Sequence, residues 1–217
     1  MKALITGGSR GIGKSIALYF ATKGIEVIIP TREELNLNDP SLIKSYISSL
    51  SSVNILINNA GVNNIQNIEE VEYNNLLETF NINFFSPYLL CSALLPKFKK
   101  QNYGRIINIS SIWSTNVKDK RSTYAASKSA IHSLTKQLIP ETKNYNILSN
   151  TISPGYISTD LTYQNNTPED INIIEQTIPL NRMGTPEEIA KLAYYLSVEN
   201  SYINGQEIII DGGFSIT

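Results

Sequence analysis

Short apolar runs alternate along the chain with longer stretches in which apolar residues recur every three or four positions. The short runs are typical of buried strands and the longer stretches of amphipathic helices. Strands are expected at residues 3–5, 26–29, 54–57, 105–109, 147–152 and 207–210, and helices at 11–23, 41–50, 73–100, 122–142 and 186–197. This order predicts an α/β fold of the Rossmann type, a doubly wound parallel sheet in three α/β/α layers.

Capping residues and prolines help to locate the ends of several of these helices. Thr185-Pro186-Glu187-Glu188 combines a capping threonine, a proline at the first helical position and acids in the first turn. Pro140 should end or bend the helix that contains it. The polar stretch at residues 163–172 is the one candidate for a mobile segment.

Length and composition fit one globular domain over residues 1–217. The chain is 41% hydrophobic and 17% charged, with a net charge of -1, which argues against a general nucleic-acid or polybasic membrane binder. No apolar run approaches the roughly 18 to 20 residues of a membrane span. No signal peptide is recognisable before residue 3. We therefore expect a soluble, cytoplasmic protein.

Cysteine and histidine are scarce. Cys91 is the only cysteine, so an intramolecular disulfide and a cysteine metal cluster are excluded, and its apolar surroundings favour a buried thiol. His132 is the only histidine, so a Ser/His/Asp hydrolase or a histidine metal site would depend on that residue alone. We expect no metal site.

A glycine-rich turn, Thr6-Gly7-Gly8-Ser9-Arg10-Gly11-Ile12-Gly13, joins the first strand to the first helix. Glycine suits backbone that has a positive φ or lies against a ligand, and free N–H groups at a helix start attract an anion such as a pyrophosphate. The spacing differs from the common G-x-G-x-x-G fingerprint. A tight turn that needs glycine only for packing is the alternative.

Two arginines favour NADP(H) over NAD(H). Arg32 follows the second strand, where an acid would instead hold the ribose 2′-hydroxyl, and Arg10 lies in the glycine turn. An arginine fork matches a 2′-phosphate. Glu33 and Glu34 argue against NADP(H), because a one-residue shift of the strand end would place a carboxylate at the position that binds the ribose 2′-hydroxyl.

Tyr124 and Lys128 lie one helical turn apart and can converge on one point. A cation about 4 Å from a phenol is worth on the order of 4 kcal/mol at an effective dielectric constant of ~20, or about 3 pKa units, which would bring the tyrosine pKa near neutral. Taken alone, such a pair is more often a surface feature. Ser110-Ser111, at the carboxyl end of the preceding strand, favours a site, because ligands bind at that edge.

The chain resembles the short-chain dehydrogenase/reductase family, in the single-domain branch that includes 3-oxoacyl-carrier-protein reductases. The resemblance extends from Leu4 to Phe214. It is carried by the glycine turn, Asn58-Asn59-Ala60-Gly61, Asn83, Ser111, Tyr124-x-x-x-Lys128, Pro154-Gly155 and Asp211-Gly212-Gly213.

The resemblance implies a role for each matching residue. Ser111 would position the substrate oxygen, Tyr124 exchange its proton, and Lys128 bind the nicotinamide ribose and lower the tyrosine pKa. Asn83 would hold a water that links Lys128 to solvent, and its spacing favours it over Asn81. The residues implied to bind the cofactor are Gly7, Ser9, Arg10, Gly11, Ile12, Gly13, Arg32, Asn36, Leu37, Asn59, Ala60, Gly61, Tyr124, Lys128, Pro154, Gly155, Ile157 and Thr159. Asn36 and Leu37 would flank the adenine, and Ile157 and Thr159 would fix the carboxamide.

Three departures from the family pattern stand out. Residues 31–38 leave little room for the usual crossover helix, so that edge of the sheet should be trimmed, as in NADP(H)-using sugar-nucleotide reductases. Pro140 interrupts a helix that forms subunit contacts in relatives, which bears on the expected homodimer or homotetramer. Lys118-Asp119-Lys120-Arg121 precedes Tyr124 and could attract an anionic substrate, although a solvated loop is the plainer interpretation.

The leading hypothesis is an enzyme that transfers hydride between NADP(H) and a carbonyl or secondary alcohol, as a carbonyl reductase of the 3-oxoacyl type. Alternatives are an oxidoreductase or epimerase-like enzyme acting on a nucleotide-linked sugar, and a catalytically silent NADP(H)-binding regulator. Substrate choice should lie in residues 112–123 and in a substrate loop around 160–178.

Overall fold

The computed structural model describes residues 1–164 and 166–217. Its sheet contains six parallel strands in the order β2-β1-β3-β4-β5-β6. The strands are β1 (Lys2–Ile5), β2 (Glu26–Ile28), β3 (Ile55–Asn58), β4 (Gly104–Ile109), β5 (Ile147–Pro154) and β6 (Glu207–Ile210). The doubly wound parallel sheet predicted from the sequence is confirmed.

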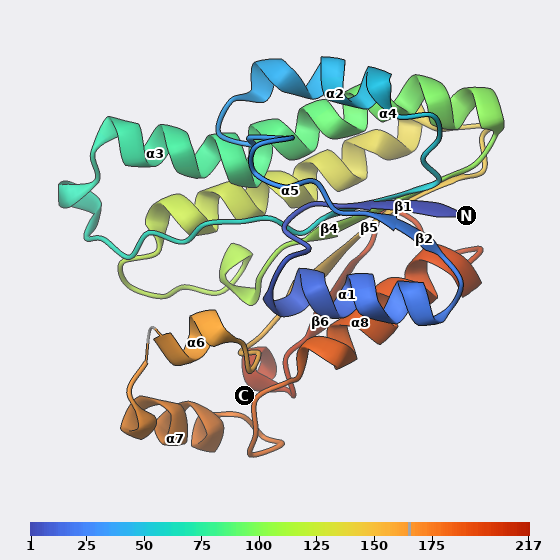
Figure 1. Ribbon diagram of the computed structural model, residues 1–217. Helices are drawn as coiled ribbons and strands as arrows, with labels where there is room; N and C mark the ends of the chain where they lie inside the picture. Colours follow the sequence, from blue (N-terminus) through green and yellow to red (C-terminus); the bar gives the residue numbers. More distant parts are fainter. Residues whose placement is uncertain (165) are drawn as a thin grey trace.

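Helices cover both faces of the sheet (Figure 1). They are α1 (Gly11–Thr22), α2 (Ile43–Ser49), α3 (Tyr73–Phe80), α4 (Ser86–Gln101), α5 (Ser122–Glu141), α6 (Asp160–Gln164), α7 (Pro168–Thr177) and α8 (Pro186–Tyr194). The helices α1 and α8 pack on one face, around Phe20 and Ile189, whereas α2, α4 and α5 pack on the other, around Leu94 and Ile131. These two buried clusters give the three layers.

The carboxyl ends of the strands all lie at one edge, and the two short helices α6 and α7 project beyond it (Figure 1). A capping box, in which the side chains of Thr167 and Asp170 each bond the other residue's backbone N–H, fixes the start of α7. The stretch 163–172, expected to be mobile, therefore includes the ends of two helices; residue 165 lies outside the described residues.

One predicted helix is divided in the structure, and another ends close to its proline. The stretch predicted as one helix at 73–100 contains a π-helical turn, Asn81–Phe85, between α3 and α4. Pro140 lies in the last turn of α5, which ends one residue later, at Glu141. Proline removes only its own N–H donor at this point, and Thr142 still donates to the Leu138 carbonyl at 3.0 Å.

The edge that we expected to be trimmed is formed by β2, which has three residues. Over the described residues, no helix has the length and apolarity needed to cross a lipid bilayer.

Candidate active site

Asn59 and Thr6 hold the glycine turn against the end of β3. The Asn59 side chain donates from Nδ2 to the carbonyl oxygens of Thr6 (3.0 Å) and Gly7 (3.1 Å). In return, Thr6 Oγ1 accepts from the backbone N–H groups of Asn59 and Ala60, both at 3.1 Å. Gly7 and Gly11 have φ values of 64° and 53°, which favour glycine. These four hydrogen bonds hold the turn in place through groups of the chain itself.

Gly13 is needed for close packing of the start of α1 against the glycine turn. A methyl group at this position would lie 2.2 Å from the Gly7 carbonyl oxygen and 2.4 Å from Asn59 Nδ2. The absence of a side chain lets α1 start directly against the turn. Arg10, at the helix N-cap, makes no capping bond with its side chain. The first N–H groups of α1 thus meet the requirements of an anion site.

A cleft of about 520 Å³ opens in front of this turn. It is lined by most of the residues that the sequence assigned to the cofactor: Gly7, Ser9, Arg10, Gly11, Ile12, Arg32, Asn36, Leu37, Asn59, Ala60, Gly61 and Thr159. The other residues assigned to the cofactor are not among its lining residues: Gly13, Tyr124, Lys128, Pro154, Gly155 and Ile157. Four further residues line the cleft: Asn38, Val62, Ile82 and Asp160. Sequence reasoning missed them because they belong to no motif and reach the cleft only through the positions of their neighbours.

Arg32 lines the cleft and the two acids after it do not. Glu34 instead accepts from the backbone N–H of Thr31 at 2.8 Å, while Thr31 Oγ1 accepts from the backbone N–H of Glu34. This local pairing occupies the Glu34 carboxylate. Glu34 is therefore a weaker argument against NADP(H) than it was from the sequence alone.

Pro154 and Gly155 serve packing at the end of β5. A methyl group on Gly155 would lie 2.6 Å from Asp211 Cβ. Ile157 is buried in the core that α1 and α8 cover, whereas Thr159 reaches the cleft beside Gly11. A contact of Pro154, Gly155 or Ile157 with the nicotinamide carboxamide stays a prediction.

Asn83 lies in the π-helical turn and is buried. Its Nδ2 donates to the Val62 carbonyl at 2.9 Å and to Ser127 Oγ at 3.0 Å, and its Oδ1 accepts from the Val62 N–H at 2.9 Å. Asn81 points elsewhere, to Asn38. The preference for Asn83 over Asn81 thus agrees with the geometry, and π-helical turns are frequent at functional sites. Its role with water stays a prediction.

Lys128 is buried, with 4% of its surface exposed. Its Nζ donates to the Ile109 carbonyl at 2.7 Å and lies 5.8 Å from the centre of the Tyr124 ring. A methyl group on Gly61 would lie 3.3 Å from both Lys128 Nζ and Asn83 Oδ1, so the lysine abuts the end of the cleft. Burial lowers the pKa of Lys128 to about 8.

The pKa of Tyr124 is shifted in the direction opposite to the one expected from the sequence. Burial raises this pKa above its ordinary value, while hydrogen bonding with Ser111 and the charge of Arg121 act in the opposite direction. Desolvation of the phenolate therefore exceeds the favourable interactions. Lys128 is not among the charges that lower this pKa.

The two serines at the end of β4 have separate roles. Ser111 is the one beside the Tyr124 phenol, and its Oγ also accepts from the Trp113 N–H at 3.2 Å. Ser110 Oγ instead donates to the Lys128 carbonyl at 3.1 Å and contacts His132 Nε2 at 2.9 Å. His132 in turn pairs with Glu207, with 2.9 Å between Nδ1 and Oε2. This agrees with a structural role for the single histidine.

Comparison with known proteins gives consistent matches. A family model described as enoyl-(acyl carrier protein) reductase matches residues 38–215. A 3-oxoacyl-[acyl-carrier-protein] reductase of Vibrio cholerae is 33% identical, covering 97% of this chain and 96% of the relative.

Two solved structures match the whole fold. A 4-hydroxyisoleucine dehydrogenase complexed with NADH has a TM-score of 0.92 and 27% identity, covering 100% of this chain and 99% of that one. A putative NAD(P)-dependent gluconate 5-dehydrogenase from Beutenbergia cavernae with bound NADP has a TM-score of 0.90 and 27% identity, covering 100% and 97%.

Proposed function

Because the chain belongs to the short-chain dehydrogenase/reductase family, and is an oxidoreductase of that family, we propose that it is an NADP(H)-dependent carbonyl reductase. The proposal depends above all on one arrangement: Lys128 lies beside Gly61 at the end of the cleft, Tyr124 lies near Lys128, and Ser111 hydrogen-bonds the Tyr124 phenol. The proposed substrate carries a 3-oxo group, as does the substrate in the name of the Vibrio relative.

The residues of the cleft fit a nicotinamide dinucleotide. The turn Gly7–Gly13 would hold the pyrophosphate, Asn36 and Leu37 the adenine, and Asn59, Ala60 and Gly61 the ribose beside it. Arg10 and Arg32, both on the cleft, support NADP(H), because guanidinium groups bind a 2′-phosphate. Relatives hold either NADP or NADH, so the preference depends on these two arginines.

When bound, NADPH supplies a hydride to the carbonyl carbon. Tyr124 would donate a proton to the carbonyl oxygen while Ser111 hydrogen-bonds that oxygen. A raised pKa keeps the phenol protonated at neutral pH, which suits a proton donor in the reductive direction. Lys128, with a pKa of about 8, is mostly protonated at pH 7 and could return a proton to the tyrosinate.

We propose that the whole chain is one cofactor-binding domain and that the described part of residues 160–178 forms the wall of its substrate site. The helix α7 packs through Ile174 and Ile171 against Tyr156 and Phe214, which follow the carboxyl ends of β5 and β6. Substrate would therefore lie between this wall and the Ser111–Tyr124 pair.

A homo-oligomer is part of the same proposal. Phe85, Tyr88 and Leu89, at the start of α4, are all at least 37% exposed. Clustered exposed apolar side chains mark interaction sites, which supports contact with a second copy.

Replacement of Tyr124 by phenylalanine tests the proposed function. The variant keeps the ring and loses the acid, so the rate of NADPH oxidation with a 3-oxoacyl substrate should fall by roughly 10² to 10⁴. Tyr145→Phe, a change at an exposed tyrosine, is the matched control and should keep the full rate. Equal rates for the wild type and Tyr124→Phe would overturn the proposal.

A further inference from the structure

Arg121 is half-buried, and two nitrogens of its guanidinium are buried without a hydrogen-bond partner. Among the residues that the structure describes, its Nε and Nη1 make no hydrogen bond, and no carboxylate pairs with it. Arg105 also has an unpaired Nε, but its Nη1 and Nη2 donate to Gly104 and Asn146, whereas Arg121 Nη1 has no acceptor. Buried polar groups are nearly always paired, and a buried cation that lacks a partner destabilises the fold. Arg121 therefore resembles half of a binding site.

The position of Arg121 relates it to the reacting groups. It is the N-cap residue of α5, three positions before Tyr124, and its charge lowers the pKa of the Tyr124 phenol. The Ala125 N–H donates to the Arg121 carbonyl at 2.8 Å, which fixes the backbone. The guanidinium is thus held near the phenol by the helix that carries both residues.

A second cation, Lys118, lies in the same loop. Its Nζ donates to the Tyr156 hydroxyl at 2.7 Å and lies 5.1 Å from the ring centres of both Trp113 and Tyr156. It too has no carboxylate within 4.0 Å among the described residues. Aromatic rings hold this ammonium in place without neutralising it.

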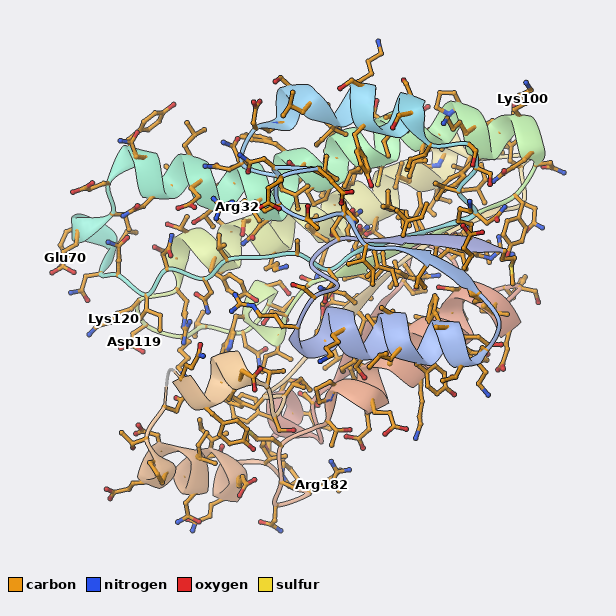
Figure 2. All side chains as sticks on the ribbon, viewed as in Figure 1. Arg32, Glu70, Lys100, Asp119, Lys120 and Arg182 are labelled. Carbon is orange, nitrogen blue, oxygen red and sulfur yellow. The ribbon has the colours of Figure 1, made fainter. Side chains whose placement is uncertain are left out.

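The cluster lies at the substrate edge of the sheet. Trp113, Tyr156 and Phe214 follow the carboxyl ends of the adjacent strands β4, β5 and β6, and their ring centres are 5.5 to 5.9 Å apart. The rest of the basic run points away: Figure 2 shows Asp119 and Lys120 at the rim of the molecule, toward the segment that carries Glu70. The run therefore divides into an outer, solvated pair and two inner cations.

We propose that Arg121, assisted by the charge of Lys118, binds a carboxylate of the substrate, so that the enzyme acts on a free oxo acid in preference to its neutral ester or thioester. The inference rests on the proposed function, since it needs the reacting carbonyl to lie beside Tyr124. A carboxylate would accept from the unpaired guanidinium and neutralise the two cations. A thioester at that place would leave both uncompensated.

The direct test compares 3-oxobutanoate with its methyl ester and its N-acetylcysteamine thioester, using the full chain and NADPH. Hydrogen bonds to charged groups imply that kcat/KM for the acid exceeds that for each neutral compound by roughly tenfold to a hundredfold. Arg121→Gln should bring the ratio of kcat/KM for the acid to that for each neutral compound close to one. Lys118→Met should reduce the same ratio by roughly threefold to tenfold. Arg182→Gln, which removes an exposed arginine that pairs with Glu188, should leave the ratio unchanged.

A binding measurement on the wild type avoids dependence on the folding of variants. In the presence of NADP⁺, 3-hydroxybutanoate should raise the unfolding temperature and its methyl ester should not. Equal effects of acid and ester, or a wild-type preference for a neutral compound, would overturn the inference, as would an unchanged ratio in Arg121→Gln. Failure of the proposed function would look different: no compound would oxidise NADPH, in the wild type or in any variant.

Discussion

The two ends of the site are built in different ways. At the cofactor end the polar groups satisfy one another: Asn59 and Thr6 exchange hydrogen bonds across the glycine turn. At the substrate end, Arg121 and Lys128 are cations that no carboxylate of the described residues pairs with. The first end keeps its shape through its own contacts, whereas the second places buried charge where a ligand can use it. Stability and function should therefore respond differently to mutation at the two ends.

Lys128→Met should have the largest effect on stability, and it should be a stabilisation. With a pKa of about 8 in the folded chain against an ordinary 10.5, the buried ammonium costs about 3 kcal/mol at pH 7. Methionine removes that cost, and we expect the free energy of unfolding to rise by about 1 to 3 kcal/mol while reductase activity is lost. Denaturant titration measures the change.

The cost of burying the Lys128 ammonium should also make the free energy of unfolding depend on pH. Between about pH 8 and 10.5 the unfolded chain holds the Lys128 proton and the folded chain does not, so raising the pH should stabilise the wild type across this window. Lys128→Met should lose that slope. Lys136→Met, an exposed position on the same helix, serves as control and should retain it. A destabilised Lys128→Met would mean that the ammonium contributes net stability.

Gly13→Ala tests the cofactor end. The added methyl group collides with the Gly7 carbonyl and Asn59, at 2.2 and 2.4 Å, so the turn must shift. Overpacking of this kind costs about 1 to 3 kcal/mol, and the Kd for NADPH should rise by roughly tenfold to a hundredfold. Fluorescence titration with NADPH measures the Kd.

Gly24→Ala is the matched control for Gly13→Ala. It stands in a left-handed turn with open space around it, so it should cost about 1 kcal/mol of stability and leave the Kd unaltered. If both alanine variants bind NADPH as the wild type does, the glycine turn does not hold the cofactor.

Arg32→Asp should have the smallest effect, a change of cofactor preference. Loss of the guanidinium and gain of an acid should move the ratio of kcat/KM for NADPH over NADH toward NADH by roughly tenfold. Glu33→Gln, which alters a charge that does not line the cleft, should keep the wild-type ratio. An unaltered preference in Arg32→Asp would refute the assignment of the 2′-phosphate to this residue.

The cofactor end could be predicted from the sequence because backbone requirements specify it. Gly7, Gly11 and Gly13 are needed for φ or for space, and glycines in that spacing after a strand are visible in the chain. Most of the strands could also be predicted, because they are short runs rich in apolar residues, whereas β5 includes Ser149, Asn150 and Thr151. Even the choice of Asn83 over Asn81 followed from spacing.

The substrate end could not be predicted in the same way. The elevated pKa of Tyr124 depends on how deeply the fold buries the phenol, which the spacing to Lys128 does not indicate. Arg121 was visible only as part of a basic run, and whether a carboxylate neutralises an arginine is decided by tertiary contacts. The π-helical turn Asn81–Phe85 was missed because one inserted residue hardly disturbs the apolar pattern of a long helix.

The central claim is that a hydride passes from a nicotinamide ring, held over the glycine turn, to a carbonyl carbon beside Tyr124. Transfer from NADPH deuterated at C4 of the nicotinamide, in each of its two epimers, tests it most directly by mass spectrometry of the alcohol product. We predict deuterium on the carbinol carbon with one epimer and none with the other. Alcohol formed without deuterium from either epimer would contradict the account.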